Sequence, residues 1–305
     1  MTLVINDKHS NSSSNKILNR VTSSVAIQGY EGSFHQVAAQ HFFGKEVTVI
    51  PCATFREVIK KASNKKESDG GVMAIENSIA GSILPNYNLL LKSQLTIVGE
   101  VYLQIGQHLL VNPGVTLEDI KEVHSHPMAL LQCIDYLEKF PHWKLVETED
   151  TALSAKHLHQ RRSRHSAAIA GKLAAELYQL NMLAANIQTE KNNYTRFLVL
   201  QNGSVATTFE NADKASLYFE TDHSKGSLAK VLAVIAENGI NLSKLQSMPI
   251  PGSDFLYGFF ADMEINDHQH FEEVIKNIKP LTANVKVLGV YKNGKLKVKN
   301  LRRWK

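Results

Sequence analysis

Between residues 25 and 201, short apolar runs of strand length alternate with segments that have the period of an amphipathic helix. Apolar runs at 25–27 and 72–75 predict buried strands, and the helical segments 34–43 and 55–66 separate such runs. This alternation is typical of parallel α/β architecture, in which crossover helices cover a sheet. The same pattern predicts strands at 47–50, 96–101, 103–111 and 196–201 and helices at 128–140 and 152–160, and the alternation continues through 167–178.

The C-terminal part has a different order of elements. Strands are predicted at 214–220, 240–248, 255–264 and 284–291, and helices at 227–238 and 270–278. The order βαββαβ is that of a ferredoxin-like domain. The chain therefore divides into a disordered polar N-terminus (1–22), an α/β part (23–202), a linker (203–213), a ferredoxin-like domain (214–291) and a basic tail (292–305).

Composition excludes several classes of protein. The chain has 305 residues, 43% hydrophobic and 21% charged, which is typical of a soluble globular protein. No apolar run approaches the roughly 18 residues of a membrane span, and the polar N-terminus does not resemble a signal peptide. Two cysteines, Cys52 and Cys133, fit a reducing cytoplasm better than a disulfide framework.

The net charge of +5 comes from one end of the chain. Residues 291–305 hold seven Lys and Arg and no acid, so removing those seven charges from +5 leaves −2. A basic tail can bind polyanions, but a solvated extension is the commoner case. We therefore predict neither nucleic-acid nor membrane binding.

Polar motifs follow several predicted strands directly. The first strand runs into a glycine-rich turn that ends at Ser33 and Phe34, and a later strand runs into Glu76-Asn77-Ser78. The turn does not match the dinucleotide fingerprint G-x-G-x-x-G. Open α/β sheets bind ligands at these carboxyl ends of strands, although capping of the next helix explains the same residues. Ser125-His126, Gln132 and Thr151 lie in or near similar positions further along the chain.

The segment 192–200 has a hydroxyl, a guanidinium and an aromatic side chain at consecutive positions, where an apolar run begins. Thr195 can move or orient a proton, Arg196 can grip a carboxylate with two hydrogen bonds, and Phe197 can wall off a ring. An ordinary strand entry remains the alternative interpretation.

Together these motifs resemble the prephenate dehydratase family, whose members convert prephenate to phenylpyruvate. The similarity rests on Gly-x-x-Gly-Ser-Phe ending at Phe34, Glu-Asn-Ser at 76–78, Ser-His-Pro followed by Gln-Cys at 125–133, and Thr-Arg-Phe at 195–197. The C-terminal domain looks like the ACT regulatory module of that family. One departure is Gln246-Ser247-Met248-Pro249 where members carry Glu-Ser-Arg-Pro.

The resemblance implies two α/β lobes similar to type II periplasmic binding proteins, with the site in the cleft between them and no cofactor or metal. The expected catalytic residues are Thr195, Arg196, Glu76, Asn77 and Ser78; the expected substrate-binding residues are Ser33, Phe34, Ser125, His126, Gln132, Thr151 and Phe197. Thr195 would assist loss of the hydroxyl, with Glu76 or water as proton source, while Arg196 would clamp a carboxylate or serve a structural role.

The same resemblance implies phenylalanine as effector and a homodimer or a dimer of dimers. The expected effector-binding residues are Gly226, Ser227, Leu228, Asn241, Gln246 and Ser247. Two alternatives stay open: an arogenate dehydratase, or a two-lobed sensor without chemistry.

Overall fold

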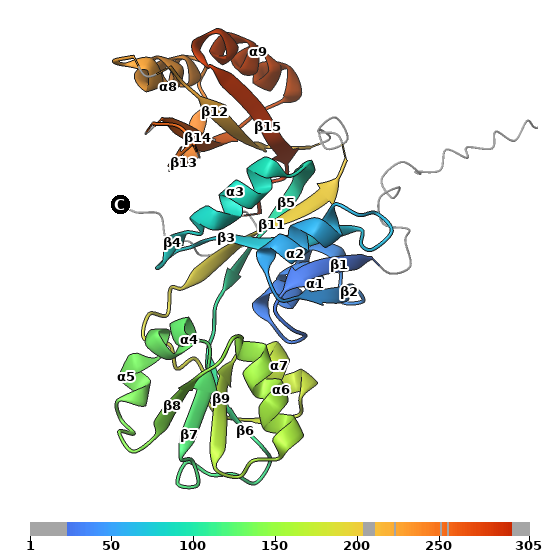
Figure 1. The fold of residues 1–305 in the computed structure, drawn as a ribbon, viewed down its shortest axis with the longest axis vertical. Coiled ribbons are helices and arrows are strands. Elements are labelled where there is room, and N and C mark those ends of the chain that lie inside the picture. The colour runs from blue at the N-terminus through green and yellow to red at the C-terminus, as the bar shows by residue number, and fades with distance from the viewer. Residues whose placement is uncertain (1–22, 204–210, 223, 251, 255, 295–305) are drawn as a thin grey trace, which may run out of the picture.

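The computed structural model describes residues 23–203, 211–222, 224–250, 252–254 and 256–294. The predicted disordered N-terminus and most of the basic tail lie outside these residues. Three bodies follow one another along the long axis of the molecule, with the C-terminal domain at one end and the second lobe at the other (Figure 1). Within the described residues, no helix is long and apolar enough to cross a membrane.

The first lobe is a mixed sheet covered by helices. Its strand order is β2-β1-β3-β11-β5, with β4 paired to β3. Strand β11 runs antiparallel to both β3 and β5, so the purely parallel sheet expected from the alternation is wrong at this point. The elements are β1 (Ser24–Gln28), α1 (Phe34–Phe43), β2 (Thr48–Cys52), α2 (Phe55–Ala62), β3 (Gly70–Asn77), β4 (Gly81–Ser82), α3 (Leu84–Lys92), β5 (Leu95–Gln104) and the late strand β11 (Tyr194–Asn202).

The second lobe is a smaller mixed sheet of order β10-β6-β9-β7-β8. Its elements are β6 (His108–Val111), β7 (Glu122–Ser125), α4 (Pro127–Gln132), α5 (Ile134–Leu137), β8 (Lys144–Glu147), α6 (Thr151–Arg161), β9 (Ser166–Ala170), α7 (Lys172–Leu177) and β10 (Asn181–Ala184). The single helix predicted over 128–140 is two helices. At the break, the Thr189 backbone N–H donates to the Gln132 carbonyl (2.7 Å) and the Thr189 hydroxyl accepts from the Asp135 N–H (3.4 Å).

Two segments connect the lobes, one from β5 to β6 and one from β10 to β11. They are hydrogen-bonded to each other where they cross. The Ile105 N–H donates to the Asn193 carbonyl, and the Ile187 N–H donates to the Gln107 carbonyl, each over 2.8 Å. The paired segments fix how the two lobes face each other.

The C-terminal domain has the βαββαβ order and the arrangement expected of an ACT module. Its antiparallel sheet has the order β13-β14-β12-β15, with helices α8 and α9 on the outer face (Figure 1). The elements are β12 (Lys214–Glu220), α8 (Ser227–Glu237), β13 (Asn241–Pro249), β14 (Tyr257–Glu264), α9 (His268–Ile278), the short 3-10 helix η2 (Lys279–Leu281) and β15 (Asn284–Tyr291).

The inner face of this sheet packs on the first lobe. Tyr218, Phe260 and Tyr291 of the ACT domain share one buried cluster with Leu90 of α3 and Leu198 of β11. The backbones approach closely at β15, where a Cβ on Gly289 would lie 2.2 Å from the Ile97 carbonyl oxygen of β5. The regulatory sheet is therefore docked directly on strands of the first lobe.

Candidate functional site

A cavity of about 230 Å³ lies between the two lobes. Eight of the predicted site residues line it, namely Ser33, Phe34, Asn77, His126, Gln132, Thr151, Thr195 and Phe197. A larger hollow of about 1090 Å³ beside α1 and β5 contains only Phe34 of that set. The interlobe cavity is therefore the candidate active site, because residues from distant motifs converge there.

Thr195 and Asn77 form the polar centre of the cavity on the first-lobe side. They face each other on β11 and β3, and Asn77 Nδ2 donates to Thr195 Oγ1 over 3.0 Å. Asn77 Oδ1 accepts from the Ile79 and Ala80 N–H groups at 3.0 and 2.9 Å. Since Asn77 occupies an acceptor position of the hydroxyl, and no described residue accepts the proton of Thr195, that proton can be donated to a ligand.

The glycine-rich turn closes the cavity against the second lobe. Gly29 has φ +89°, and a Cβ there would lie 2.6 Å from Asp150 Oδ2. The Tyr30 hydroxyl donates to Glu149 Oε1 over 3.0 Å, and the Tyr178 hydroxyl donates to the Glu31 carbonyl over 2.8 Å. The turn therefore provides contacts between the lobes as well as the start of α1.

Two helices begin at the cavity wall. Ser33 caps α1, its hydroxyl accepting from the Gln36 N–H, and Asp150 caps α6, its Oδ1 accepting from the Leu153 N–H over 2.9 Å. Burial raises the pKa of Asp150 above its ordinary value, against the opposing effect of hydrogen bonds from the Leu153 and Ala152 N–H groups. The partial positive charge of a helix N-terminus favours anions.

Aromatic rings form the floor of the cavity. His35 packs edge-on against Phe197 with ring centroids 5.0 Å apart, and its Nε2 accepts from the Ala74 N–H. Burial lowers the pKa of His35 to about 3, so the ring is neutral at physiological pH. This part of the wall is therefore apolar and uncharged.

The lining residues include no Lys or Arg, and two of them are acids, Glu149 and Asp150. An anionic ligand would therefore meet helix N-termini, amide side chains and His126 rather than a Lys or Arg. Five polar lining residues were not predicted from the sequence: Gln28, His35, Gln107, Glu149 and Asp150. Glu149 and Asp150 had a detectable signal, because they directly precede Thr151 at a predicted helix start.

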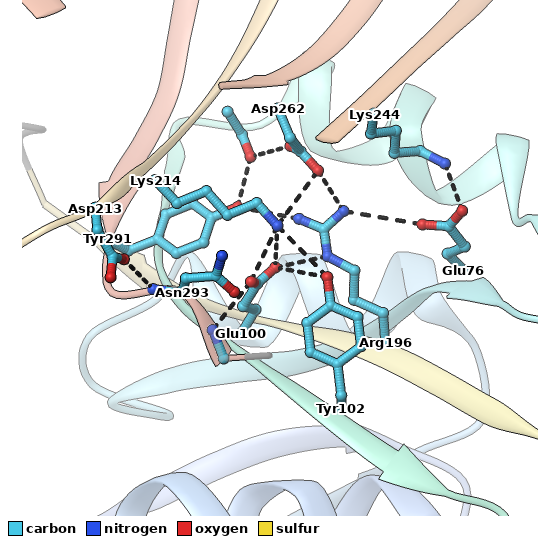
Figure 2. Close-up of polar contacts among 12 residues, drawn as sticks. Glu76, Glu100, Tyr102, Arg196, Asp213, Lys214, Lys244, Asp262, Tyr291 and Asn293 are labelled. Atoms are coloured by element: carbon cyan, nitrogen blue, oxygen red, sulfur yellow. Dashed lines mark hydrogen bonds and ion pairs between the residues drawn. The ribbon is translucent and has the colours of Figure 1, made fainter. Parts of the chain in front are cut away.

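The other four predicted residues do not line the cavity. The Ser125 hydroxyl donates to the Ile169 carbonyl inside the second lobe, and the Ser78 hydroxyl bonds the backbone of Asn192 and Tyr194. Arg196 and Glu76 lie on the face of the sheet that meets the ACT domain (Figure 2). Side chains alternate along a strand, so Arg196 must point away from the cavity if Thr195 points into it. This placement does not fit a carboxylate clamp.

The predicted effector residues lie on separate elements of the ACT domain. A cavity of about 270 Å³ at the start of α8 is lined by Ser227 but not by Asn241 or Gln246. Strand β13, which carries Asn241, Gln246 and Ser247, is separated from β12 by β14. Gly226, with φ +82°, caps α8, and Leu228 packs in the domain core. Within one chain these residues do not form a single pocket at the start of α8.

The fold and the cavity define a two-lobed α/β protein with an interlobe ligand site and a C-terminal regulatory-type domain. The family model described as prephenate dehydratase matches residues 25–205. The chain therefore belongs to the prephenate dehydratase family.

Relatives and solved structures extend this similarity beyond the two lobes. A bifunctional chorismate mutase/prephenate dehydratase of Aquifex aeolicus is 36% identical over 88% of this chain and 73% of its own length. Arogenate dehydratase 2 of Petunia hybrida is 37% identical over 88% of this chain and 71% of its own.

Two solved structures are similar over nearly the whole of both chains. Prephenate dehydratase from Arthrobacter aurescens in complex with L-Phe is 26% identical with a TM-score of 0.79, covering 92% of this chain and 93% of that one. GqqA, described as a quorum-quenching acylase, is 27% identical with a TM-score of 0.80, covering 90% of this chain and 100% of that one.

Proposed function

We propose that this chain converts prephenate to phenylpyruvate, carbon dioxide and water in the cavity between its lobes. The observation that carries the proposal is Thr195, whose hydroxyl proton is free to be donated into a cavity lined by the family's motifs. Aromatisation of the ring drives the reaction, so the protein must chiefly position the substrate and assist departure of the hydroxyl.

Thr195 donates its hydrogen bond to the ring hydroxyl that leaves. As the ring carboxylate departs as carbon dioxide, its bonding electrons enter the ring, the carbon–oxygen bond breaks, and a proton on the leaving oxygen makes water. General acid assistance contributes about 10²–10⁴-fold. Glu76 pairs with Lys244 on the other face of the sheet, so water in the cavity rather than Glu76 resupplies this proton.

The two substrate carboxylates are held without a cation from the cavity wall. The N-terminus of α1 and Thr151 at the start of α6 face the cavity, and Gln132 and His126 supply polar side chains. Phe34 and Phe197 enclose the ring. Positioning of this kind, together with dipoles fixed before the reaction begins, provides the remainder of the rate enhancement.

The decisive experiment is incubation of the purified chain with prephenate and, separately, with arogenate, following phenylpyruvate and phenylalanine. We expect phenylpyruvate from prephenate. Turnover of arogenate alone would make the chain an arogenate dehydratase, and no product from either would favour a sensor without chemistry.

The ACT domain binds phenylalanine and joins copies of this chain into a homodimer or a dimer of dimers in the cytoplasm. The Arthrobacter aurescens relative was crystallised with L-Phe. Strand β13 is an edge of the ACT sheet, so a second copy could bring its Gln246 and Asn241 towards the start of α8. A monomer by light scattering at micromolar concentration would contradict this assembly.

A further inference from the structure

Two consecutive residue pairs link β3 and β11, and they face opposite sides of the sheet. Thr195 pairs with Asn77, and Arg196 pairs with Glu76. The first pair lies at the cavity, whereas the second meets the ACT domain, where Arg196 Nη1 lies 3.9 Å from Glu76 Oε2. The catalytic pair and the interdomain pair are therefore neighbours on the same two strands.

The ACT domain contacts both members of the second pair. Lys244 of β13 donates to Glu76 Oε1 and to the Ser82 hydroxyl, each over 2.8 Å. Asp262 of β14 accepts from Arg196 Nη1, and the Tyr291 hydroxyl of β15 accepts from Arg196 Nη2 over 3.0 Å (Figure 2). Three ACT strands thus hold the residues next to Thr195 and Asn77.

The charges of this cluster balance only when both parts are present. Glu76, Glu100 and Arg196 of the first lobe carry a net −1, and Lys214, Lys244 and Asp262 of the ACT domain carry a net +1. Lys214 Nζ donates to both oxygens of Glu100, at 3.0 and 2.9 Å. Neither side can be separated from the other without leaving buried charge uncompensated.

The centre of the cluster is closed to water. Arg196 is 4% exposed, Glu100 4% and Lys214 1%. Burial alone would raise the pKa of Asp262, but Arg196 and Lys214 outweigh it and hold that pKa below its ordinary value. Buried and paired side chains have few alternative positions, so this contact can transmit a displacement from one domain to the other.

We infer that Lys244 and Asp262 of the ACT domain are positioning residues for Thr195 and Asn77, acting through Glu76 and Arg196. This inference rests on the proposed function, which places the chemistry at Thr195. Arg196 directly follows Thr195 in β11, and Glu76 directly precedes Asn77 in β3. A movement of the ACT sheet against the first lobe is therefore passed to the catalytic hydroxyl through a single peptide unit on each strand. The regulatory domain is thereby part of the support of the active site.

Lys244 gives the cleanest test, because its partner Glu76 is 35% exposed and the pair can be broken without stranding a fully buried charge. Lys244→Met removes the contact and Lys244→Arg restores it. Lys286→Met is the matched control: Lys286 Nζ donates to the Leu91 and Ser93 carbonyls at 3.0 and 3.1 Å, across the same interface but away from β3 and β11.

With prephenate as substrate, we expect Lys244→Met to lower kcat about tenfold while KM changes less than about twofold. Lys244→Arg and Lys286→Met should stay within about twofold of the wild type. Asp262→Asn should lower kcat in the same way as Lys244→Met.

Hydrogen exchange provides a readout that does not depend on turnover, since the Ser78 N–H donates to the Tyr194 carbonyl and the Ile79 and Ala80 N–H groups donate to Asn77. Exchange over 76–82 and 192–196 should be faster in Lys244→Met and unchanged in Lys286→Met.

An unchanged kcat and unchanged exchange in Lys244→Met would overturn the inference. Equal losses in Lys244→Met and Lys286→Met would also overturn it, because domain docking in general would then suffice. A wild-type chain that converts neither prephenate nor arogenate would reject the proposed function, while the exchange measurements would still decide whether the two pairs are coupled.

Discussion

Asn77 Nδ2 donates to Thr195 Oγ1 over 3.0 Å, and the two residues lie directly opposite each other on β3 and β11. The amide occupies an acceptor position of the hydroxyl and leaves its proton for the ligand. Asn77 also accepts two backbone hydrogen bonds from the turn that follows β3. Catalysis at Thr195 should therefore depend on a residue that need not touch the reacting bond.

Replacement of Thr195 tests the proton donor. Thr195→Val keeps the shape and removes the hydroxyl, so kcat with prephenate should fall by about 10²-fold or more. Thr195→Ser keeps the hydroxyl and should retain most of the activity. A fall smaller than about tenfold in Thr195→Val, under roughly 1.4 kcal/mol, would show that Thr195 is not the donor.

Replacement of Asn77 tests the orientation of Thr195. Asn77→Asp keeps the oxygen that accepts from the Ile79 and Ala80 N–H groups but removes the amide that donates to Thr195 Oγ1, Asn193 Oδ1 and the Tyr194 carbonyl, so kcat should fall about tenfold and the free energy of unfolding should fall as well. Asn77→Ala removes both functions and should also lower the free energy of unfolding by about 1–3 kcal/mol. Steady-state kinetics and urea unfolding measure the two effects. Equal kcat in Asn77→Asp and the wild type would contradict the orienting role.

Arg196 should matter for stability rather than for substrate affinity. Arg196→Met leaves Glu100 and Asp262 buried with Lys214 as the remaining cation near both, and should lower the free energy of unfolding by about 3–5 kcal/mol. Arg196→Lys keeps the positive charge but not the several N–H donors of the guanidinium group, and it should lower the free energy of unfolding less. KM of the folded Arg196→Lys variant should change less than about threefold. A strongly raised KM at unchanged stability would support the carboxylate clamp after all.

His35 should make the protein less stable as the pH falls below neutrality. Its pKa is lowered from 6.5 to about 3 by burial, so between these values the unfolded chain binds a proton that the folded chain does not. The contribution of His35 to the free energy of unfolding is largely present above about pH 6.5. The free energy of unfolding then falls by about 1 kcal/mol between about pH 6.5 and about pH 5.5.

Urea unfolding at these pH values measures the effect. His35→Gln offers an acceptor to the Ala74 N–H without a titrating ring, so its free energy of unfolding should fall less over this interval. His35→Leu should show the same flattening at lower stability throughout. A pH dependence identical to that of the wild type would show that His35 is protonated to the same extent in both states.

Phenylalanine binding should be weaker than in relatives that carry Glu at the position of Gln246. The Gln246 amide is used locally, since its Nε2 donates to the Ser247 carbonyl, and its oxygen offers an ammonium group no negative charge. Gln246→Glu should tighten binding by roughly 1–3 kcal/mol in calorimetric titration. No heat at millimolar phenylalanine would mean that the ACT domain serves assembly alone. Binding that Gln246→Glu fails to tighten would place the ammonium elsewhere.

The sequence by itself determined the elements whose patterns are local. Helix α1, strand β12 and strand β15 have the predicted bounds, since each has a clear period and is bounded by turn residues or a cap. The motifs at 76–78 and 195–197 also predicted which strands carry the cavity. Strands β8 and β10 were missed, because four-residue strands at a sheet edge have little pattern of their own.

Only the tertiary structure decided which face of the sheet the side chain of each motif residue occupies. Alternation along β11 requires Thr195 and Arg196 to face opposite ways, but nothing local specifies which of them faces the ligand. That choice depends on Asp262, which is 66 positions further along the chain, and on Glu100, which is 96 positions earlier. Arg196 is buried among partners from two domains, and only the docking of the ACT sheet brings those charges together.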